Sequence, residues 1–163
     1  MNCKHYKISV ETGEKMAIIK SKKSLHGITV PHRKHTENSQ SVVMDQADEI
    51  RIPMQQHMGA PCVPLVKAGD RVLLGQKVGD SGEFFSVPIH ASCSGTVSRI
   101  EDYQTINGMK TKLVVIENDH QYELSPEVQK PNLQNKEDFL KAVRESGLVG
   151  LGGAGFPVHV KLG

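Results

Sequence analysis

The stretch from residue 59 to residue 101, GAPCVPLVKAGDRVLLGQKVGDSGEFFSVPIHASCSGTVSRIE, decides the fold of this chain. Short apolar runs alternate in it with clusters of Gly, Asp and Ser, which are typical of turns. Strands this short, divided by turns at such close intervals, predict a small closed or sandwiched β unit. The turns are expected at residues 67–70, 75–76 and 79–82, and the strands at residues 72–74, 84–89 and 96–100.

The rest of the chain adds further strand candidates and one strong turn signal. Val114, Val115 and Ile116 follow one another without a polar residue, which predicts a strand buried on both faces. Asn107-Gly108, just before it, is typical of a hairpin turn. The additional strands are expected at residues 16–19, 49–52 and 111–117.

One helix is well marked near the end of the chain. Residues 124–135 contain two prolines among polar residues and are typical of a linker. Asn135 can cap the helix that follows, because its side chain can accept a hydrogen bond from a free backbone N–H. Gly147 supplies the stop. The first turn has the acidic residues Glu137 and Asp138, and the apolar stripe consists of Phe139, Leu140 and Val143.

Length and composition exclude several kinds of protein. The chain of 163 residues suits one domain, or one domain and part of another, and its net charge of +2 gives no case for nucleic acid as a partner. No run approaches the roughly 20 apolar residues that a membrane helix needs. Cys3, Cys62 and Cys93 are too far apart to suggest a disulfide framework or a metal clamp. We therefore expect a soluble, cytosolic chain with no membrane span and no metal site.

The histidines are weak candidates for chemistry. His26, His32 and His35 lie in one segment, but their spacing is a poor match to a metal site, and a loop that packs across the β unit or meets a partner is favoured. His57 and His90 flank strand candidates beside Gly or Pro. Because no nucleophile or carboxylate pair stands beside them in the sequence, they are interpreted as hydrogen-bonded loop histidines. We expect no catalytic residue in this chain.

A glycine loop follows the helix. Residues 147–157, GLVGLGGAGFP, allow backbone N–H groups to approach a phosphate or a flat ring without interference from a Cβ atom. Gly150, Gly152 and Gly155 match G-x-G-x-x-G, but a helix precedes the loop and Pro157 follows it, which is the wrong context for a Rossmann fold. The apolar residues of the loop also argue against a flexible linker. A nucleotide-binding loop of another fold is the better interpretation.

The stretch from residue 59 to residue 101 resembles the biotinyl/lipoyl carrier type of domain, the barrel-sandwich hybrid. The resemblance rests on VKAGDRVLLGQKVGD and on VPIHASCSGTVSRIE. Carrier domains present a lysine for acylation on the hairpin between these two halves. Here that hairpin is DSGEFFSV, residues 80–87, and it contains no lysine. The resemblance therefore implies the fold, with a docking or structural role in place of a carrier role.

The end of the chain resembles a second family. GLVGLGGAGFPVHVKLG is similar to the start of the flavin- and NADH-binding domain in the 51-kDa subunit of respiratory complex I. Its form GLGGAGFP, followed by HVKL, resembles the C subunit of the Rnf electron transport complex. That family shares HGITVPHRKHTEN, IPMQQHMGAPCVPLVKAGDRVLLGQKVGD and VPIHASCSGTVSRIE with this chain, so the resemblance covers roughly residues 25–163.

The resemblance implies a peripheral subunit on the cytoplasmic side of the cell membrane. It implies a complex that passes electrons between ferredoxin and NAD and couples them to Na⁺ or H⁺ transport, with the other Rnf subunits as partners. It also implies FMN, an NAD(H) site and two [4Fe–4S] clusters. The complex I pattern has arginines where Val149 and Leu151 stand here, so arginine contacts are not carried over. The residues that match the FMN/NAD loop are Gly150, Gly152, Gly153, Ala154, Gly155 and Phe156, and Lys161 matches the lysine after it.

The expected fold class is mainly β, with a barrel-sandwich hybrid followed by the start of an α/β flavin/NAD-binding domain. The expected parts are a polar arm at residues 1–24, the barrel at 25–124, a linker at 125–135 and the truncated start of the nucleotide domain at 136–163. Family members continue to cysteine clusters, and this chain has no C-x-x-C, so we expect a fragment. Alone it is expected to be inactive, to hold no cofactor and to have a mobile tail after Gly147.

Two other interpretations stay open at this point. The chain also resembles the cobalamin reductase of propanediol-using microcompartments, which shares these modules. A non-catalytic β docking module that ends in a glycine loop is the alternative from a different class.

Overall fold

The computed structural model describes residues 9–10, 17–18 and 33–163, and the chain divides into two compact units, residues 1–43 and 44–163. In the first unit β1 (Ser9–Val10) pairs antiparallel with β2 (Ala17–Ile18). Strand β2 lies within the strand expected at residues 16–19. Residues 35–38 form a turn, in which the Glu37 amide donates to the Lys34 carbonyl. His26 and His32 lie outside the described residues, as does most of the expected arm.

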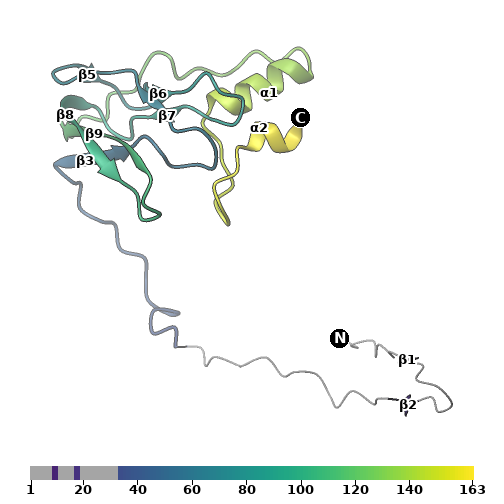
Figure 1. Ribbon diagram of the computed structural model, residues 1–163. Helices are drawn as coiled ribbons and strands as arrows, with labels where there is room; N and C mark the ends of the chain where they lie inside the picture. Colours follow the sequence, from purple (N-terminus) through teal and green to yellow (C-terminus); the bar gives the residue numbers. More distant parts are fainter. Residues whose placement is uncertain (1–8, 11–16, 19–32) are drawn as a thin grey trace. The chain divides into compact units, whose positions relative to one another are not determined.

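The second unit contains two antiparallel sheets (Figure 1). Their strands are short because turns interrupt the chain at close intervals, as the sequence predicts. The prediction of a mainly β chain is confirmed. The larger sheet has the order β3-β9-β8-β5, with β3 (Glu49–Pro53), β9 (Lys110–Asn118), β8 (Gly95–Gln104) and β5 (Arg71–Val72), and the smaller has the order β4-β6-β7, with β4 (Val63–Pro64), β6 (Lys77–Asp80) and β7 (Ile89–His90).

The core of this unit is aliphatic. It contains no aromatic ring among its fully buried side chains, in keeping with an aromatic content of 4% and no Trp. Residues 113–116 of β9 are buried without interruption, so the predicted burial on both faces is confirmed. Burial of such side chains contributes about 1.5–3 kcal/mol each. The buried cluster consists of Ile52, Met54, Cys62, Val72, Val78, Ile89, Ala91, Cys93, Val97, Val114 and Ile116.

Two of the local predictions are wrong. Gly79 and Asp80 belong to β6 and not to a turn. Gly79 is needed for packing, because a Cβ atom there would lie 2.4 Å from Sδ of Met54. The strand expected at residues 84–89 is irregular up to β7, since its backbone groups bond to loops instead of a ladder. The Phe85 carbonyl accepts from the Ala60 amide at 3.0 Å, and the Val87 amide donates to Nε2 of His57 at 3.4 Å.

The expected hairpin turn joins β8 to β9. Gly108 has φ of 80°, a conformation that favours glycine, and the Thr105 amide donates to the Met109 carbonyl at 2.8 Å. The side chains of the loop point outward, and Ile106 is fully exposed. Asn107-Gly108 therefore marks the turn correctly.

The helix α1 (Lys136–Glu145) begins and ends as predicted. Oδ1 of Asn135 accepts from the Asp138 amide at 2.8 Å, and Gly147 follows the helix with φ of 71°. The second helix, α2 (Val158–Leu162), follows the glycine loop, and Figure 1 shows it beside α1. In the part of the chain that the structure describes, no helix has the length and apolar character to cross a membrane.

The segment before α1 is tied to the sheets. Leu124 forms an isolated bridge with Leu74, and the Ser125 amide donates to the Leu74 carbonyl at 2.9 Å. Val128 packs against Gly75, where a Cβ atom would lie 2.5 Å from a Val128 methyl. The domain boundary expected at residues 125–135 stays a prediction about the chain's organisation.

Replacement of Ile116 by Ala tests the aliphatic core. Ile116 is completely buried on β9, so Ile116→Ala should lower the free energy of unfolding by about 2–5 kcal/mol. The measurement is denaturant unfolding of the 163-residue chain. Ile106→Ala removes the same atoms from a fully exposed position and should change the stability by less than about 0.5 kcal/mol. Equal losses in the two variants would contradict this description of the core.

Candidate functional site

The glycine loop is a narrow hairpin. Val149 and Pro157 form an antiparallel bridge, and the Gly150 amide donates to the Phe156 carbonyl at 3.0 Å. The Val158 amide closes the base of the hairpin by donating to the Leu148 carbonyl at 3.1 Å. Residues 151–154 form the exposed turn at its tip. The loop therefore has a defined base and an open end.

The glycines of this hairpin serve different purposes. Gly155 has φ of 69°, and a Cβ atom there would lie 3.2 Å from the Gln56 carbonyl oxygen, so the fold itself requires a glycine. A Cβ atom on Gly152 or Gly153 would meet nothing within 4 Å, and neither residue has a positive φ. The described residues thus give no structural reason for these two glycines. The absence of side chains there leaves their backbone N–H groups open to an incoming group.

The hairpin rests on the barrel through its second half. The Gly155 carbonyl accepts from the Met58 amide at 3.0 Å, and the Phe156 ring meets the Phe85 ring edge-on with centroids 5.1 Å apart. Beyond the hairpin, the buried His159 places Nε2 3.1 Å from the Phe84 carbonyl oxygen. The tail after Gly147, which the sequence predicts to be mobile, contacts the barrel through Gly155, Phe156 and His159. Its mobility stays a prediction.

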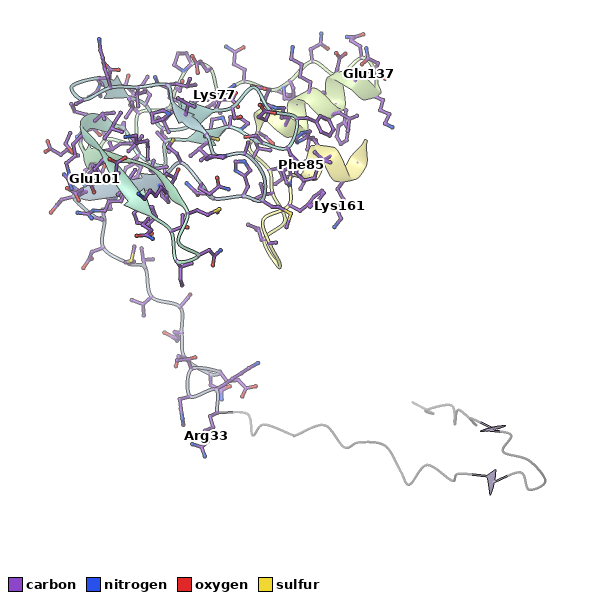
Figure 2. The ribbon with its side chains drawn as sticks, viewed as in Figure 1. Arg33, Lys77, Phe85, Glu101, Glu137 and Lys161 are labelled. Atoms are coloured by element: carbon purple, nitrogen blue, oxygen red, sulfur yellow. The ribbon has the colours of Figure 1, made fainter. Side chains whose placement is uncertain are left out.

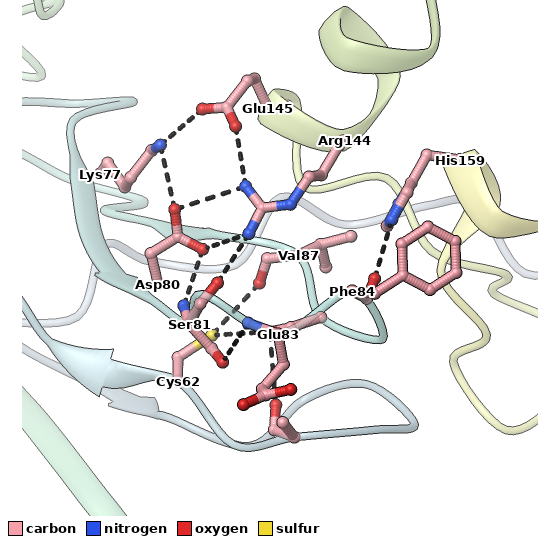
Figure 3. A network of polar contacts seen from close by, with 12 residues as sticks. Cys62, Lys77, Asp80, Ser81, Glu83, Phe84, Val87, Arg144, Glu145 and His159 are labelled. Atoms are coloured by element: carbon pink, nitrogen blue, oxygen red, sulfur yellow. Dashed lines mark hydrogen bonds and ion pairs between the residues drawn. The ribbon is translucent and has the colours of Figure 1, made fainter.

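An ion-pair network joins the end of α1 to the barrel (Figure 3). Nη2 of Arg144 donates to Oδ1 of Asp80 and to the Ser81 carbonyl, both at 2.8 Å. Nη1 of Arg144 donates to Glu145 at 2.7 Å, and Lys77 donates to both Glu145 and Asp80. Two cations and two carboxylates thus alternate around the end of α1.

The network keeps its carboxylates charged. Partial burial alone would raise the pKa of Asp80, but hydrogen bonds from Arg144 and from the Ser81 amide outweigh it and hold that pKa below its ordinary value. The pKa of Glu145 is lowered in the same way, against burial, by Lys77 and Arg144. The ion pairs are therefore present throughout the neutral pH range.

The structure brings most of the predicted site residues together. Lys161 lies on α2 (Figure 2) and is exposed. Within the described residues it has no ion pair. The loop residues share the one hairpin, and only the last two of them contact the barrel. These loop residues are Gly150, Gly152, Gly153, Ala154, Gly155 and Phe156.

A buried polar cluster under the hairpin was not anticipated. Nε2 of His57 lies 3.1 Å from Oγ of Ser86, and Sγ of Cys62 donates to the Val87 carbonyl at 3.2 Å. Burial lowers the pKa of His57 and raises that of the Cys62 thiol, which favours the neutral imidazole and the protonated thiol. His57 is hydrogen-bonded as expected, whereas His90 lies in β7 and not in a loop.

Two grooves lie on the second unit outside the glycine loop. One, of about 650 Å³, is lined by α1, by residues 127–131 and by Lys77 and His90. The other, of about 520 Å³, lies between residues 61–64 and the β8–β9 hairpin. Neither groove includes a residue of the glycine loop, and no group of three metal-binding side chains occurs among the residues described.

Comparison with known families decides what this architecture is. A family model described as the RnfC barrel sandwich hybrid domain matches residues 22–121, more than half of the chain. The chain belongs to the RnfC family. The predicted barrel-sandwich hybrid is thereby confirmed, and the two sheets of residues 44–163 are the RnfC barrel with α1, the glycine hairpin and α2 attached.

Similarity to curated RnfC proteins supports the same family. The chain is 42% identical over 140 residues to the C subunit of the Na(+)-translocating ferredoxin:NAD(+) oxidoreductase complex of Acetobacterium woodii, covering 83% of this chain and 32% of that protein. It is 42% identical to the proton-translocating counterpart of Clostridium ljungdahlii, over 80% of this chain and 29% of that protein. It is 37% identical to the C subunit of the ion-translocating oxidoreductase complex of Vibrio cholerae, over 83% of this chain and 18% of that protein. The chain thus spans about a third or less of the length of these relatives.

The buried His57 and the half-buried His90 predict a pH dependence of stability. Burial lowers the pKa values of His57 and His90, so the unfolded chain binds protons near pH 6.5 that the folded chain does not. The free energy of unfolding should be highest above pH 7 and should fall as the pH drops from about 6.5 to 5.5. His57→Gln should make this decline shallower, whereas His35→Gln, in an exposed turn, should leave it unchanged. Urea unfolding at a series of pH values measures this, and an identical slope in both variants would refute it.

Proposed function

We propose that this chain is the N-terminal part of the peripheral electron-transfer subunit of an ion-translocating ferredoxin:NAD oxidoreductase complex. In this proposal the glycine hairpin forms part of a binding site for FMN and NAD(H), and the barrel carries it. The observation that supports it most strongly is the pair Gly152 and Gly153, whose missing side chains serve no contact within the described residues. The names of the relatives support the reaction, since each is the C subunit of such an oxidoreductase complex.

The hairpin fits one wall of a nucleotide site. Its exposed tip carries consecutive small residues, Gly152, Gly153 and Ala154, which allow a phosphate or a flat ring to approach the backbone N–H groups. Lys161 supplies a positive charge on the following helix, suited to a phosphate. Neither groove is lined by a residue of the hairpin tip, and the remaining walls of the site are proposed to come from the longer protein.

Bound flavin would supply hydride chemistry with the nicotinamide and pass electrons on. The residues of this chain would bind and orient, since none of the described side chains at the hairpin can donate or accept a proton near the tip. The described residues do not fit an iron–sulfur cluster, because Cys62 and Cys93 are both buried and no three metal-binding side chains meet. We place the [4Fe–4S] clusters of the proposal elsewhere in the longer protein, and the other Rnf subunits and the cytoplasmic membrane face as its surroundings.

A visible spectrum tests this function. The polypeptide from the complete gene should be purified without oxygen and then treated with NADH. Flavin and iron–sulfur absorption that NADH bleaches would support the electron-transfer function. A colourless protein that does not respond to NADH would refute it and favour a non-catalytic docking module.

Substitution of Gly152 separates binding from folding. In the complete protein, Gly152→Ala should weaken NADH or FMN binding by about tenfold, because the new methyl group meets only an incoming ligand. The melting temperature should stay unchanged. Gly82→Ala is the matched control, since a Cβ atom there also meets nothing within 4 Å, and it should affect neither property. Binding is measured by flavin fluorescence and by the KM for NADH, and equal affinities in the two variants would contradict the role of the hairpin.

A further inference from the structure

Both ends of the glycine hairpin are attached to one barrel segment, residues 80–87. Arg144 stands three residues before Gly147, where the hairpin begins, and it binds Asp80 and the Ser81 carbonyl. Phe156 and His159 follow the tip and contact Phe85 and the Phe84 carbonyl. The chain therefore contacts residues 80–87 both before and after the hairpin tip.

The Arg144 contact is directional. Two nitrogens of its planar guanidinium face the Asp80 carboxylate, since Nη2 donates to Oδ1 at 2.8 Å and Nη1 donates to Oδ2 at 3.5 Å. Nη2 also donates to the Ser81 carbonyl at 2.8 Å. Such a fork fixes orientation as well as distance, which a lysine does not do. The Arg144 and Asp80 side chains are only 22% and 21% exposed, so water competes weakly for them. Lys77 pairs with both Asp80 and Glu145, and Arg144 also pairs with Glu145. Each cation of the network therefore contacts two carboxylates.

The segment at residues 80–87 is itself attached to the barrel at Phe85. The Phe85 carbonyl accepts from the Ala60 amide at 3.0 Å. Gly59, with φ of 121°, lies so close that a Cβ atom on it would be 1.9 Å from the Phe85 carbonyl oxygen. The neighbouring Met58 amide binds the Gly155 carbonyl. Residues 58–60 of the barrel therefore contact both the segment at residues 80–87, through Phe85, and the second half of the hairpin, through Gly155.

We propose that Asp80, Phe85 and Arg144 are positioning residues for the nucleotide site, which hold the glycine hairpin at a fixed place and angle on the barrel. This inference rests on the proposed function, in which the hairpin tip binds the phosphate or ring of a dinucleotide or flavin. The segment at residues 80–87 then has a defined task, which is to serve as the platform for this loop. Loss of the Arg144 fork should displace the tip without removing any atom that touches the ligand.

The test uses the complete protein loaded with flavin. Arg144→Met keeps the length of the side chain and removes the fork, and it should raise the KM for NADH about tenfold while kcat stays within about twofold. Asp80→Asn keeps the volume and removes the charge, and it should change KM in the same direction. Arg144→Lys restores the charge without the fork and should recover part of the affinity.

A matched control is available in a separate ion-pair network of the same barrel. Arg71 pairs with Asp119 and Glu123 and contacts nothing in the hairpin, so Arg71→Met should leave KM unchanged. An NADH response in the wild-type protein, with unchanged KM in both Arg144→Met and Asp80→Asn, would overturn the positioning role alone. A wild-type protein without flavin or an NADH response would overturn the proposed function, and the positioning role with it.

Discussion

The bond between Arg144 and Asp80 joins the helical end of the chain to the barrel. The helix α1 has no buried side chain, and Phe139 of its predicted apolar stripe is 44% exposed. Leu140 and Val143 of that stripe are only partly buried, so hydrophobic burial holds this helix less strongly than it holds the barrel strands. Hydrogen bonds to charged groups contribute about 1.5–3 kcal/mol each. The Arg144 bonds to Asp80 and Ser81 are therefore a strong attachment of α1 to the barrel, beside the Lys77–Glu145 pair. The placement of the glycine hairpin, which starts directly after the helix, depends on it.

The barrel has a hydrophobic core of its own. Its aliphatic residues are buried within the two sheets and require nothing from α1 or α2. The hairpin and the helices, in contrast, bury few side chains and lean on the barrel at residues 57–60 and 80–87. This division suits a module that supports a binding loop, since a stable platform limits the movement of a loop whose tip must stay open.

The sequence predicts the features that depend on local signals. The buried run of β9, the Asn107-Gly108 turn and the Asn135 cap each require only neighbouring residues, and the structure contains all three. The composition of residues 147–157 predicts a glycine loop, and the resemblance to known families points to its residues. Its hairpin shape comes from the Val149–Pro157 bridge. The separate roles of Gly152 and Gly155 required the surroundings of each residue, which no spacing reveals.

The failures share one physical cause, which is contact between distant parts of the chain. Residues 84–87 have β-forming side chains, but their backbone groups bond to His57, Ala60 and Cys62, so no strand forms. Arg144 and Asp80 are 64 residues apart, and each looks like an ordinary surface charge in the sequence. The contacts of Gly155 and Phe156 with Met58 and Phe85 likewise join residues that no local pattern connects.

Amide hydrogen exchange, resolved by residue with NMR, tests the central claim that the barrel holds the glycine hairpin in place. The Met58 amide is the direct reporter, because its acceptor is the Gly155 carbonyl across the contact. The account predicts slow exchange at Met58, Gly150 and Val158, and fast exchange at Gly152 and Gly153 in the exposed tip. Exchange at Met58 and Gly150 as fast as at the tip would contradict it, because the hairpin would then be detached from the barrel.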